Sequence, residues 1–252
     1  MKISVLASGI PGLDEMLGGG FPQDRVILVI GGPGSGKTIF ASQFLYKGAV
    51  DYSENGIYIS LDESKDHLYE EMIKFGWDFK KLEDEKKVAF IDATLMSRRT
   101  TTMEEIYGES NSVNAKQLPI DKLMEQLEEK IHEIGAKRVV LDTLATLFLR
   151  FPEQIERRIA IVDLIEALSE MNITTIITSE LESTALDRKI TTEEFMVHGV
   201  ILMEKIFSEG STTRALQIEK MRTAKINHNK VPYTIESEGI EIYPDVKLFK
   251  SS

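Results

Sequence analysis

Cysteine is missing from the 252 residues of this sequence. Its absence excludes disulfide bonds, thiolate metal sites and cysteine nucleophiles. The four histidines do not have the spacing of metal ligands, so we expect core, capping or surface roles for His67, His132, His198 and His228.

Long apolar runs are also missing. No stretch of 18 consecutive apolar residues occurs, so no segment predicts a membrane-spanning helix. Residues 1–7 contain too short an apolar segment for a secretory signal peptide. We therefore expect a cytoplasmic protein that does not contact a membrane.

Basic residues are in the minority. Lys and Arg number 30 against 41 Asp and Glu, which gives a formal net charge of −11. A broad nucleic-acid-binding surface needs the opposite balance. The local basic groups are Arg98-Arg99, Arg157-Arg158 and Lys220-Met221-Arg222, and we expect solvated surface charge for the first two. Nucleic acid is not the favoured partner, although a small basic patch leaves room for it.

The glycine-rich segment 31–38 is the most informative motif that is present. Its residues Gly-Gly-Pro-Gly-Ser-Gly-Lys-Thr fit the phosphate-binding pattern G-x-x-x-x-G-K-[ST]. The apolar run 26–30 predicts a buried strand before the motif, and residues 39–46 predict a helix after it. A helix that starts behind such a turn directs its backbone N–H groups at one point, which suits a polyphosphate.

The residues of this motif have separate predicted roles. Glycine lets the backbone curl around the phosphates, Lys37 reaches the β- and γ-phosphates, and the Thr38 hydroxyl ligates Mg²⁺. A glycine-rich turn that binds nothing is the alternative, and the flanking strand and helix weigh against it. The sequence predicts a nucleoside triphosphate site formed by Gly32, Pro33, Gly34, Ser35, Gly36, Lys37, Thr38 and Ile39.

Strand and helix patterns alternate for about 180 residues, which is typical of a mostly parallel sheet flanked by helices. Further strands are predicted over 56–61, 88–91, 138–141 and 173–178, and helices over 66–75, 120–134 and 155–171. The polar segment 97–118 predicts a long loop with room for a short helix. Short strands over 200–206, 214–220, 233–235 and 240–243 predict an antiparallel C-terminal extension. We expect one α/β domain over residues 1–252.

Three carboxylates follow predicted strands. Asp142 closes the strand 138–141, and ligands of open α/β sheets bind beyond the carboxyl ends of the strands, so we predict that it holds the Mg²⁺ shell. Asp62 and Glu63 follow the strand 56–61, and either could orient or deprotonate an attacking water. Helix capping is the alternative for all three.

Several segments together resemble RecA-superfamily ATPases of the KaiC type. The resemblance starts in Ser8-Gly9-Ile10-Pro11-Gly12-Leu13-Asp14-Glu15 and Gly18-Gly19-Gly20-Phe21-Pro22, and it continues through the glycine-rich motif and the acidic pair. It returns in residues 193–201, in Glu219-Lys220-Met221-Arg222, and in Pro232-Tyr233-Thr234-Ile235 with Gly239-Ile240. It covers nearly the whole chain, and it implies a RecA-like fold and ATP as the nucleotide.

The resemblance also implies catalytic roles and a partner. The first carboxylate after the second strand activates water in such proteins and is normally Glu, whereas this chain has Asp62 followed by Glu63. Lys220 and Arg222 match a pair that reaches the γ-phosphate of a neighbouring subunit and stabilises transition-state charge there. A group supplied in trans implies head-to-tail contacts, so we expect a homohexameric ring. Two basic side chains on one solvated strand face are the alternative.

Three functions remain open at this stage. The first is a slow, Mg²⁺-dependent ring ATPase that couples its nucleotide state to an unknown protein partner. The second is a DNA-binding ATPase resembling RadA, against which the acidic balance and the lack of interleaved aromatic and basic residues count. The third is a nucleotide-sensing regulator that barely hydrolyses ATP, which Asp62 in place of Glu keeps plausible. His198 stands where relatives usually have Asp.

Overall fold

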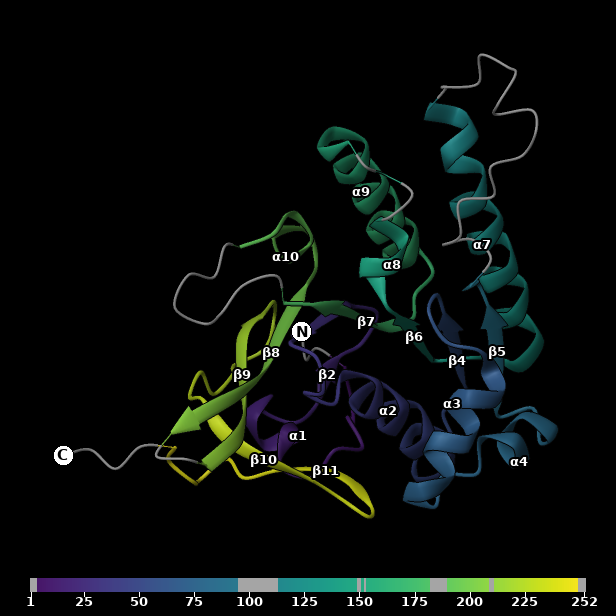
Figure 1. Cartoon of the computed structure of the whole chain (residues 1–252). Helices are drawn as coiled ribbons and strands as arrows, with labels where there is room; N and C mark the ends of the chain where they lie inside the picture. Colours follow the sequence, from purple (N-terminus) through teal and green to yellow (C-terminus); the bar gives the residue numbers. More distant parts are fainter. Residues whose placement is uncertain are drawn as a thin grey trace.

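A computed structural model describes residues 4–94, 113–148, 151, 153–181, 190–208 and 211–248 (Figure 1). Within these ranges, nine strands form one sheet in the order β11-β10-β9-β8-β3-β7-β6-β4-β5. The strands are β3 Val26–Gly31, β4 Gly56–Ser60, β5 Val88–Asp92, β6 Arg138–Asp142, β7 Thr174–Glu180, β8 Gly199–Ser208, β9 Ser211–Met221, β10 Val231–Glu236 and β11 Gly239–Ile242.

The sheet has a parallel part and an antiparallel part. Strands β3 to β8 pair in parallel, whereas β9, β10 and β11 each run antiparallel to their neighbours. The predicted α/β fold with antiparallel C-terminal strands is therefore confirmed. The parallel strands direct their carboxyl ends to one edge, called here the carboxyl edge, and their starts to the opposite amino edge.

Helices cover both faces of the parallel strands (Figure 1). One face carries α2 Lys37–Asp51, α3 Lys65–Met72 and α4 Phe79–Asp84, and the other carries α7 Val113–Ile134, α8 Leu144–Phe148 and α9 Gln154–Glu170. Successive strand residues alternate between the two cores: Val140 packs on the α2 side, and Val139 and Leu141 pack on the α7 and α9 side. None of the described helices combines the length and hydropathy that crossing a membrane requires.

The smaller elements and one helix boundary differ from the sequence prediction. The pattern missed α1 Leu13–Met16, the two-stranded sheet of β1 Val5–Leu6 with β2 Phe21–Pro22, and α10 Thr192–Met196, because such short elements carry little periodicity. It also missed α4. The predicted start of a helix at residue 120 is wrong, since α7 begins at Val113 and runs through Pro119, a residue more common at helix starts. The rest of the predicted loop, residues 97–112 with Arg98-Arg99, lies outside the described residues.

A buried arginine joins four parts of the chain. The Arg138 side chain at the start of β6 is 0% exposed, and its guanidinium donates to the Phe44 carbonyl at 2.8 Å and to the Ala7 carbonyl at 2.8 Å. Its Nε donates to Glu54 Oε2 at 2.9 Å, and its Nη2 donates a second, short hydrogen bond to the same oxygen. Burial lowers the pKa of Arg138, and Glu54 opposes that shift. The charge is thus matched by acceptors from α2, the 52–55 turn and the N-terminal segment.

We expect Arg138→Leu to destabilise the fold strongly. The substitution removes the donors to Glu54 and to two backbone carbonyls, and breaking a buried ion pair from one side costs about 3–5 kcal/mol. Urea unfolding measures this change in the free energy of unfolding. Lys47→Met is the control, because Lys47 pairs with Asp51 on the surface at 3.7 Å and should contribute less than about 1 kcal/mol. Equal losses in the two variants would contradict a special role for Arg138.

Candidate functional site

The phosphate-binding motif forms the turn between β3 and α2. Gly34 and Gly36 adopt left-handed φ angles of 69° and 96°, which side chains with a Cβ rarely adopt. A Cβ on Gly36 would also lie 2.7 Å from the Ile235 side chain of β10. No side chain caps the first turn of α2, so its backbone N–H groups are available to an anion.

Lys37 lies in a desolvated position over this loop. Its Nζ donates to the Gly31 carbonyl at 2.9 Å and to the Gly32 carbonyl at 3.4 Å. Among the described residues, no carboxylate comes within ion-pair distance of this ammonium. Burial lowers the pKa of Lys37, with Glu180 and Asp142 acting in the opposite direction. A partly buried cation with only carbonyl partners fits a polyphosphate that enters the loop.

Asp142 is the hydrogen-bond acceptor at the centre of the site. Its Oδ2 accepts from the Thr38 hydroxyl at 2.9 Å and from the Tyr58 hydroxyl at 2.7 Å. Its Oδ1 accepts a short hydrogen bond from the Thr178 hydroxyl. The carboxylate is thus directed at α2, β4 and β7 and not at the start of α8, which disfavours the helix-capping alternative.

The residues around Thr38 fit a magnesium ion. Because the Thr38 hydroxyl donates its hydrogen bond to Asp142, its lone pairs are left for a cation on the loop side. No group of three His, Asp or Glu side chains converges on a metal position within the described ranges. Mg²⁺ keeps several waters and takes phosphate oxygens beside one or two protein ligands, and Thr38 and Asp142 can supply these protein ligands. The metal roles of Thr38 and Asp142 remain predictions.

The acidic pair lies at the same edge. Asp62 and Glu63 line a cavity of about 120 Å³ together with Lys37, Thr38, Ser60, Asp142, Thr143 and Glu180. Asp62 is exposed and Glu63 half-buried. Burial raises the pKa of Glu63, nearby Glu71 adds to this, and His67 partly offsets it. Both carboxylates precede Ser64, which is the residue at the cap of α3. The structure therefore brings the predicted catalytic carboxylates together with the phosphate loop.

Sequence reasoning missed four residues of this site. Glu180 ends β7 and faces the same cavity, so the strand-end rule that singled out Asp142 could have found it. Tyr58 and Thr178 lie within strands, where nothing in the pattern separates them from core residues. The Tyr233 hydroxyl of β10 donates to the Ser35 carbonyl at 2.5 Å, and this contact between distant segments has no local signal.

Lys220 and Arg222 lie away from their own phosphate loop. The backbone N–H of Arg222 donates to the His198 carbonyl, and His198 pairs with Val26 at the start of β3. The loop follows Gly31 at the other end of β3, about 17 Å along the strand. An arginine side chain does not span that distance. Arg222 is exposed, whereas the Lys220 ammonium donates to the carbonyls of Glu194 and Phe195 at 3.0 and 3.1 Å.

His198 has a structural role at the amino edge. Its ring Nδ1 accepts a hydrogen bond from the backbone N–H of Val26 at 3.2 Å, and its backbone N–H donates to the Val26 carbonyl at 2.9 Å. Burial lowers the pKa of His198, and the charges of Arg25, Arg222 and Lys220 lower it further. His198 therefore binds β3 through its ring and its backbone N–H, and it binds the turn after β9 through its backbone carbonyl. Its ring is kept neutral, and the three cations whose charges act on it are called here the basic cluster.

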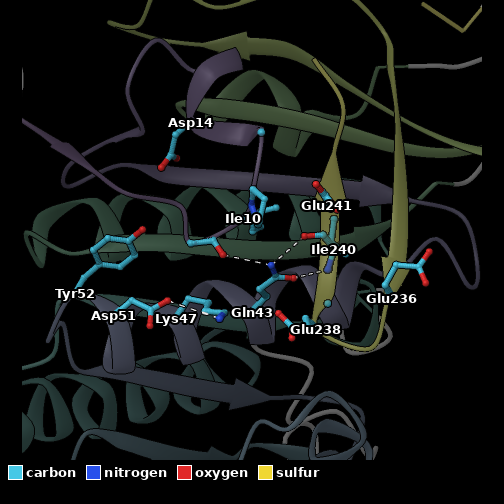
Figure 2. Close-up of a pocket in the computed structure, with 14 residues that line it drawn as sticks. Ile10, Asp14, Gln43, Lys47, Asp51, Tyr52, Glu236, Glu238, Ile240 and Glu241 are labelled. Carbon is cyan, nitrogen blue, oxygen red and sulfur yellow. Dashed lines mark hydrogen bonds and ion pairs between the residues drawn. The ribbon is translucent and has the colours of Figure 1, made fainter. Parts of the chain in front are cut away.

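A larger cavity of about 430 Å³ lies elsewhere (Figure 2). It is lined by the 9–14 segment, the middle and end of α2 with Tyr52, and the β10–β11 hairpin, and no residue of the 31–38 loop lines it. Gln43 accepts from the Ile240 N–H at 2.6 Å and donates to the Ile240 and Gly9 carbonyls, which joins these three segments (Figure 2). The smaller cavity is our candidate for the nucleotide site, because Lys37, Thr38 and Asp142 meet there.

Comparison with known proteins agrees with this geometry. A family model described as "ATPase: KaiC" matches residues 6–247. A UPF0273 protein of Methanocaldococcus jannaschii is 36% identical over 96% of this chain and 97% of its own length. The circadian clock protein KaiC2 of Synechocystis is 31% identical over 96% of this chain, which spans 40% of that relative.

A solved structure is similar as well. The crystal structure of a KaiC-like protein from Pyrococcus horikoshii matches with a TM-score of 0.80 and 34% identity, and the match covers 96% of this chain and 100% of that one. Sequence, topology and the phosphate loop thus agree, and the chain belongs to the KaiC-like family of RecA-fold ATPases.

Proposed function

We propose that the protein hydrolyses ATP in a Mg²⁺-dependent reaction and works as a homo-oligomeric ring, whose nucleotide state controls the binding of a protein partner. The observation that supports hydrolysis best is the Thr38–Asp142 hydrogen bond beside a desolvated Lys37 in an uncapped glycine loop. These groups bind a polyphosphate and its metal ion together. The choice of ATP follows from the family.

The residues of the site divide the reaction among them. The loop N–H groups and Lys37 hold the phosphates, and Thr38 with Asp142 holds Mg²⁺, which when bound neutralises charge on the β- and γ-phosphates. Glu63 is our choice for the group that orients and deprotonates water, because burial raises its pKa toward neutral pH whereas Asp62 is exposed. Asp62 then adds negative charge at the mouth of the site.

The positions of the two sheet edges support the proposed ring. The phosphate loop lies at the carboxyl edge, and the basic cluster of Arg25, Lys220 and Arg222 lies at the amino edge. Head-to-tail contacts would place the basic cluster of one subunit against the phosphate loop of the next. In that arrangement Arg222 stabilises the charge of the transferring phosphoryl group in trans.

We expect Lys37→Ala to abolish tight ATP binding. The substitution removes the cation over the loop while leaving the loop glycines in place, and charge-assisted bonds to phosphate are strong. Isothermal titration of ATP with Mg²⁺ measures the loss. Lys80→Ala, which removes an exposed α4 cation that pairs with Asp84 on the surface at 3.6 Å, should bind as wild type. Unchanged affinity of Lys37→Ala would contradict the phosphate-loop assignment.

We expect Glu63→Gln to lower kcat at least about 10²-fold with ATP binding retained, and Asp62→Asn to lower it far less. Because the base must be ionised, wild-type turnover should fall as the pH drops through a pKa above the ordinary value for glutamate. Single-turnover hydrolysis across a pH series measures both effects. The opposite order of the two variants would assign the base to Asp62. No turnover in wild type, with firm ATP binding, would indicate a nucleotide-sensing regulator.

We expect Arg222→Ala to keep ATP binding and to lose turnover by about 10³-fold or more. The decisive measurement mixes this variant with Lys37→Ala. Each variant is expected to be inactive alone. In a mixed ring, the intact phosphate loop of an Arg222→Ala subunit can lie next to the intact Arg222 of a Lys37→Ala subunit. A working site then forms, and turnover partly returns. No recovery on mixing, or a fully active Arg222→Ala, would return Arg222 to plain surface charge. Turnover stimulated by DNA would instead favour the DNA-binding alternative.

A further inference from the structure

The hydroxyl of Tyr58 lies in the core beside the sheet, where apolar packing does not require a hydroxyl group. Tyr58 is 1% exposed and belongs to the apolar core on the α2 side of the sheet. The register pairs Ser60 of β4 with Asp142 of β6, so Tyr58, two residues earlier on the same face, is a diagonal neighbour of Asp142. Its hydroxyl donates to Asp142 Oδ2 at 2.7 Å.

Both oxygens of the Asp142 carboxylate accept hydrogen bonds from hydroxyl groups. Thr38 shares Oδ2 with Tyr58, and Thr178 of β7 donates to Oδ1. Thr38 lines the phosphate cavity, whereas Tyr58 and Thr178 are buried and do not line it. The two buried hydroxyls therefore contact the carboxylate from the sheet, and the accessible one contacts it from the loop.

Aromatic packing holds the phenol in place. The Tyr58 ring stacks on Phe90 of β5, with centroids 5.8 Å apart and planes 4° from parallel. Phe90 in turn meets Tyr69 of α3 edge-on at 6.0 Å. Stacked and edge-on arrangements are the ones that aromatic pairs prefer, so both contacts stabilise the position of the rings. The Tyr58 hydroxyl is therefore held next to Asp142.

We infer that Tyr58 is a positioning residue for the magnesium ion. Together with Thr178 it sets the orientation of the Asp142 carboxylate, so that Asp142 accepts the hydrogen bond of the Thr38 hydroxyl and the Thr38 lone pairs are directed at the cation. Tyr58 contacts neither nucleotide nor metal and acts through Asp142. Partners of this kind, one bond removed from a metal site, usually change metal affinity 10- to 100-fold. The inference rests on the proposed Mg²⁺-ATP site.

The test compares ATP affinity with and without the metal. For Tyr58→Phe, we expect ATP binding in excess Mg²⁺ to weaken about tenfold, and the Mg²⁺ concentration for half-maximal binding to rise by a similar factor. Binding in EDTA should match wild type, because the phosphate loop is unchanged. Equilibrium titration with a fluorescent ATP analogue, under MgCl₂ and under EDTA, gives both values without relying on turnover.

Two further variants make the result specific. Tyr69→Phe makes the same substitution at the other tyrosine whose ring contacts Phe90. It does not alter the donors to Asp142, so the Mg²⁺ dependence of this variant should equal that of wild type. Thr178→Val removes the Oδ1 donor and should reproduce the effect of Tyr58→Phe, which keeps the inference testable if Tyr58→Phe does not fold.

The outcomes separate this inference from the proposed function. Wild-type Mg²⁺ dependence in Tyr58→Phe and Thr178→Val would overturn the positioning role while leaving the ATP site intact. Equal losses with Mg²⁺ and with EDTA would also overturn it, because a general packing defect does not distinguish the two conditions. Absence of ATP binding in wild type under either condition would instead overturn the proposed function.

Discussion

The carboxylate of Asp142 connects the parts of the chain on which the site depends. It closes β6 and accepts hydrogen bonds from a helix residue, Thr38, and from two neighbouring strands through Tyr58 and Thr178. Each donor is held by a different element, so the site keeps its shape only if α2, β4, β6 and β7 pack in register. A partly buried carboxylate with matched donors is stable, whereas an unmatched one costs free energy, and this couples the site to the fold.

Parallel pairing explains why these groups meet. Strands that run in one direction end at one edge, and the connections after β3, β4, β6 and β7 therefore bring the phosphate loop, the acidic pair, Asp142 and Glu180 to one cavity. The antiparallel extension supports that edge from the side. The Tyr233 hydroxyl donates to the Ser35 carbonyl, and the Ile235 side chain occupies the space that a Cβ on Gly36 would need.

The same strand direction separates the basic cluster from the loop. Because β9 runs antiparallel to β8, its last residues return to the amino edge, where Arg222 and Lys220 surround His198 with Arg25. One subunit thus carries a phosphate loop at one edge and cations at the other. This polarity is what a head-to-tail ring requires, and it is the physical basis of our proposal for action in trans. Arg138, at the amino end of β6, joins the N-terminal segment to the same scaffold.

Local sequence alone determined the elements that have strong local signals. The glycine-rich motif, the apolar strand before it and most strand and helix positions could be predicted, because backbone freedom and side-chain periodicity act within a few residues. The strand-end rule located Asp142 and the acidic pair. The early start of α7 and the short elements could not be predicted, since tertiary packing outweighs weak local preference.

Only the tertiary structure decided which side chains meet. Tyr58 has the local pattern of a core residue, and its contact with Asp142 depends on the register between β4 and β6. Tyr233 contacts a loop that lies 198 residues earlier in the chain. The placement of Arg222 away from its own loop depends on the antiparallel return of β9. Such contacts join residues that are distant in sequence, and their geometry follows from strand order and register, which a single sequence encodes only through the packing of the whole chain.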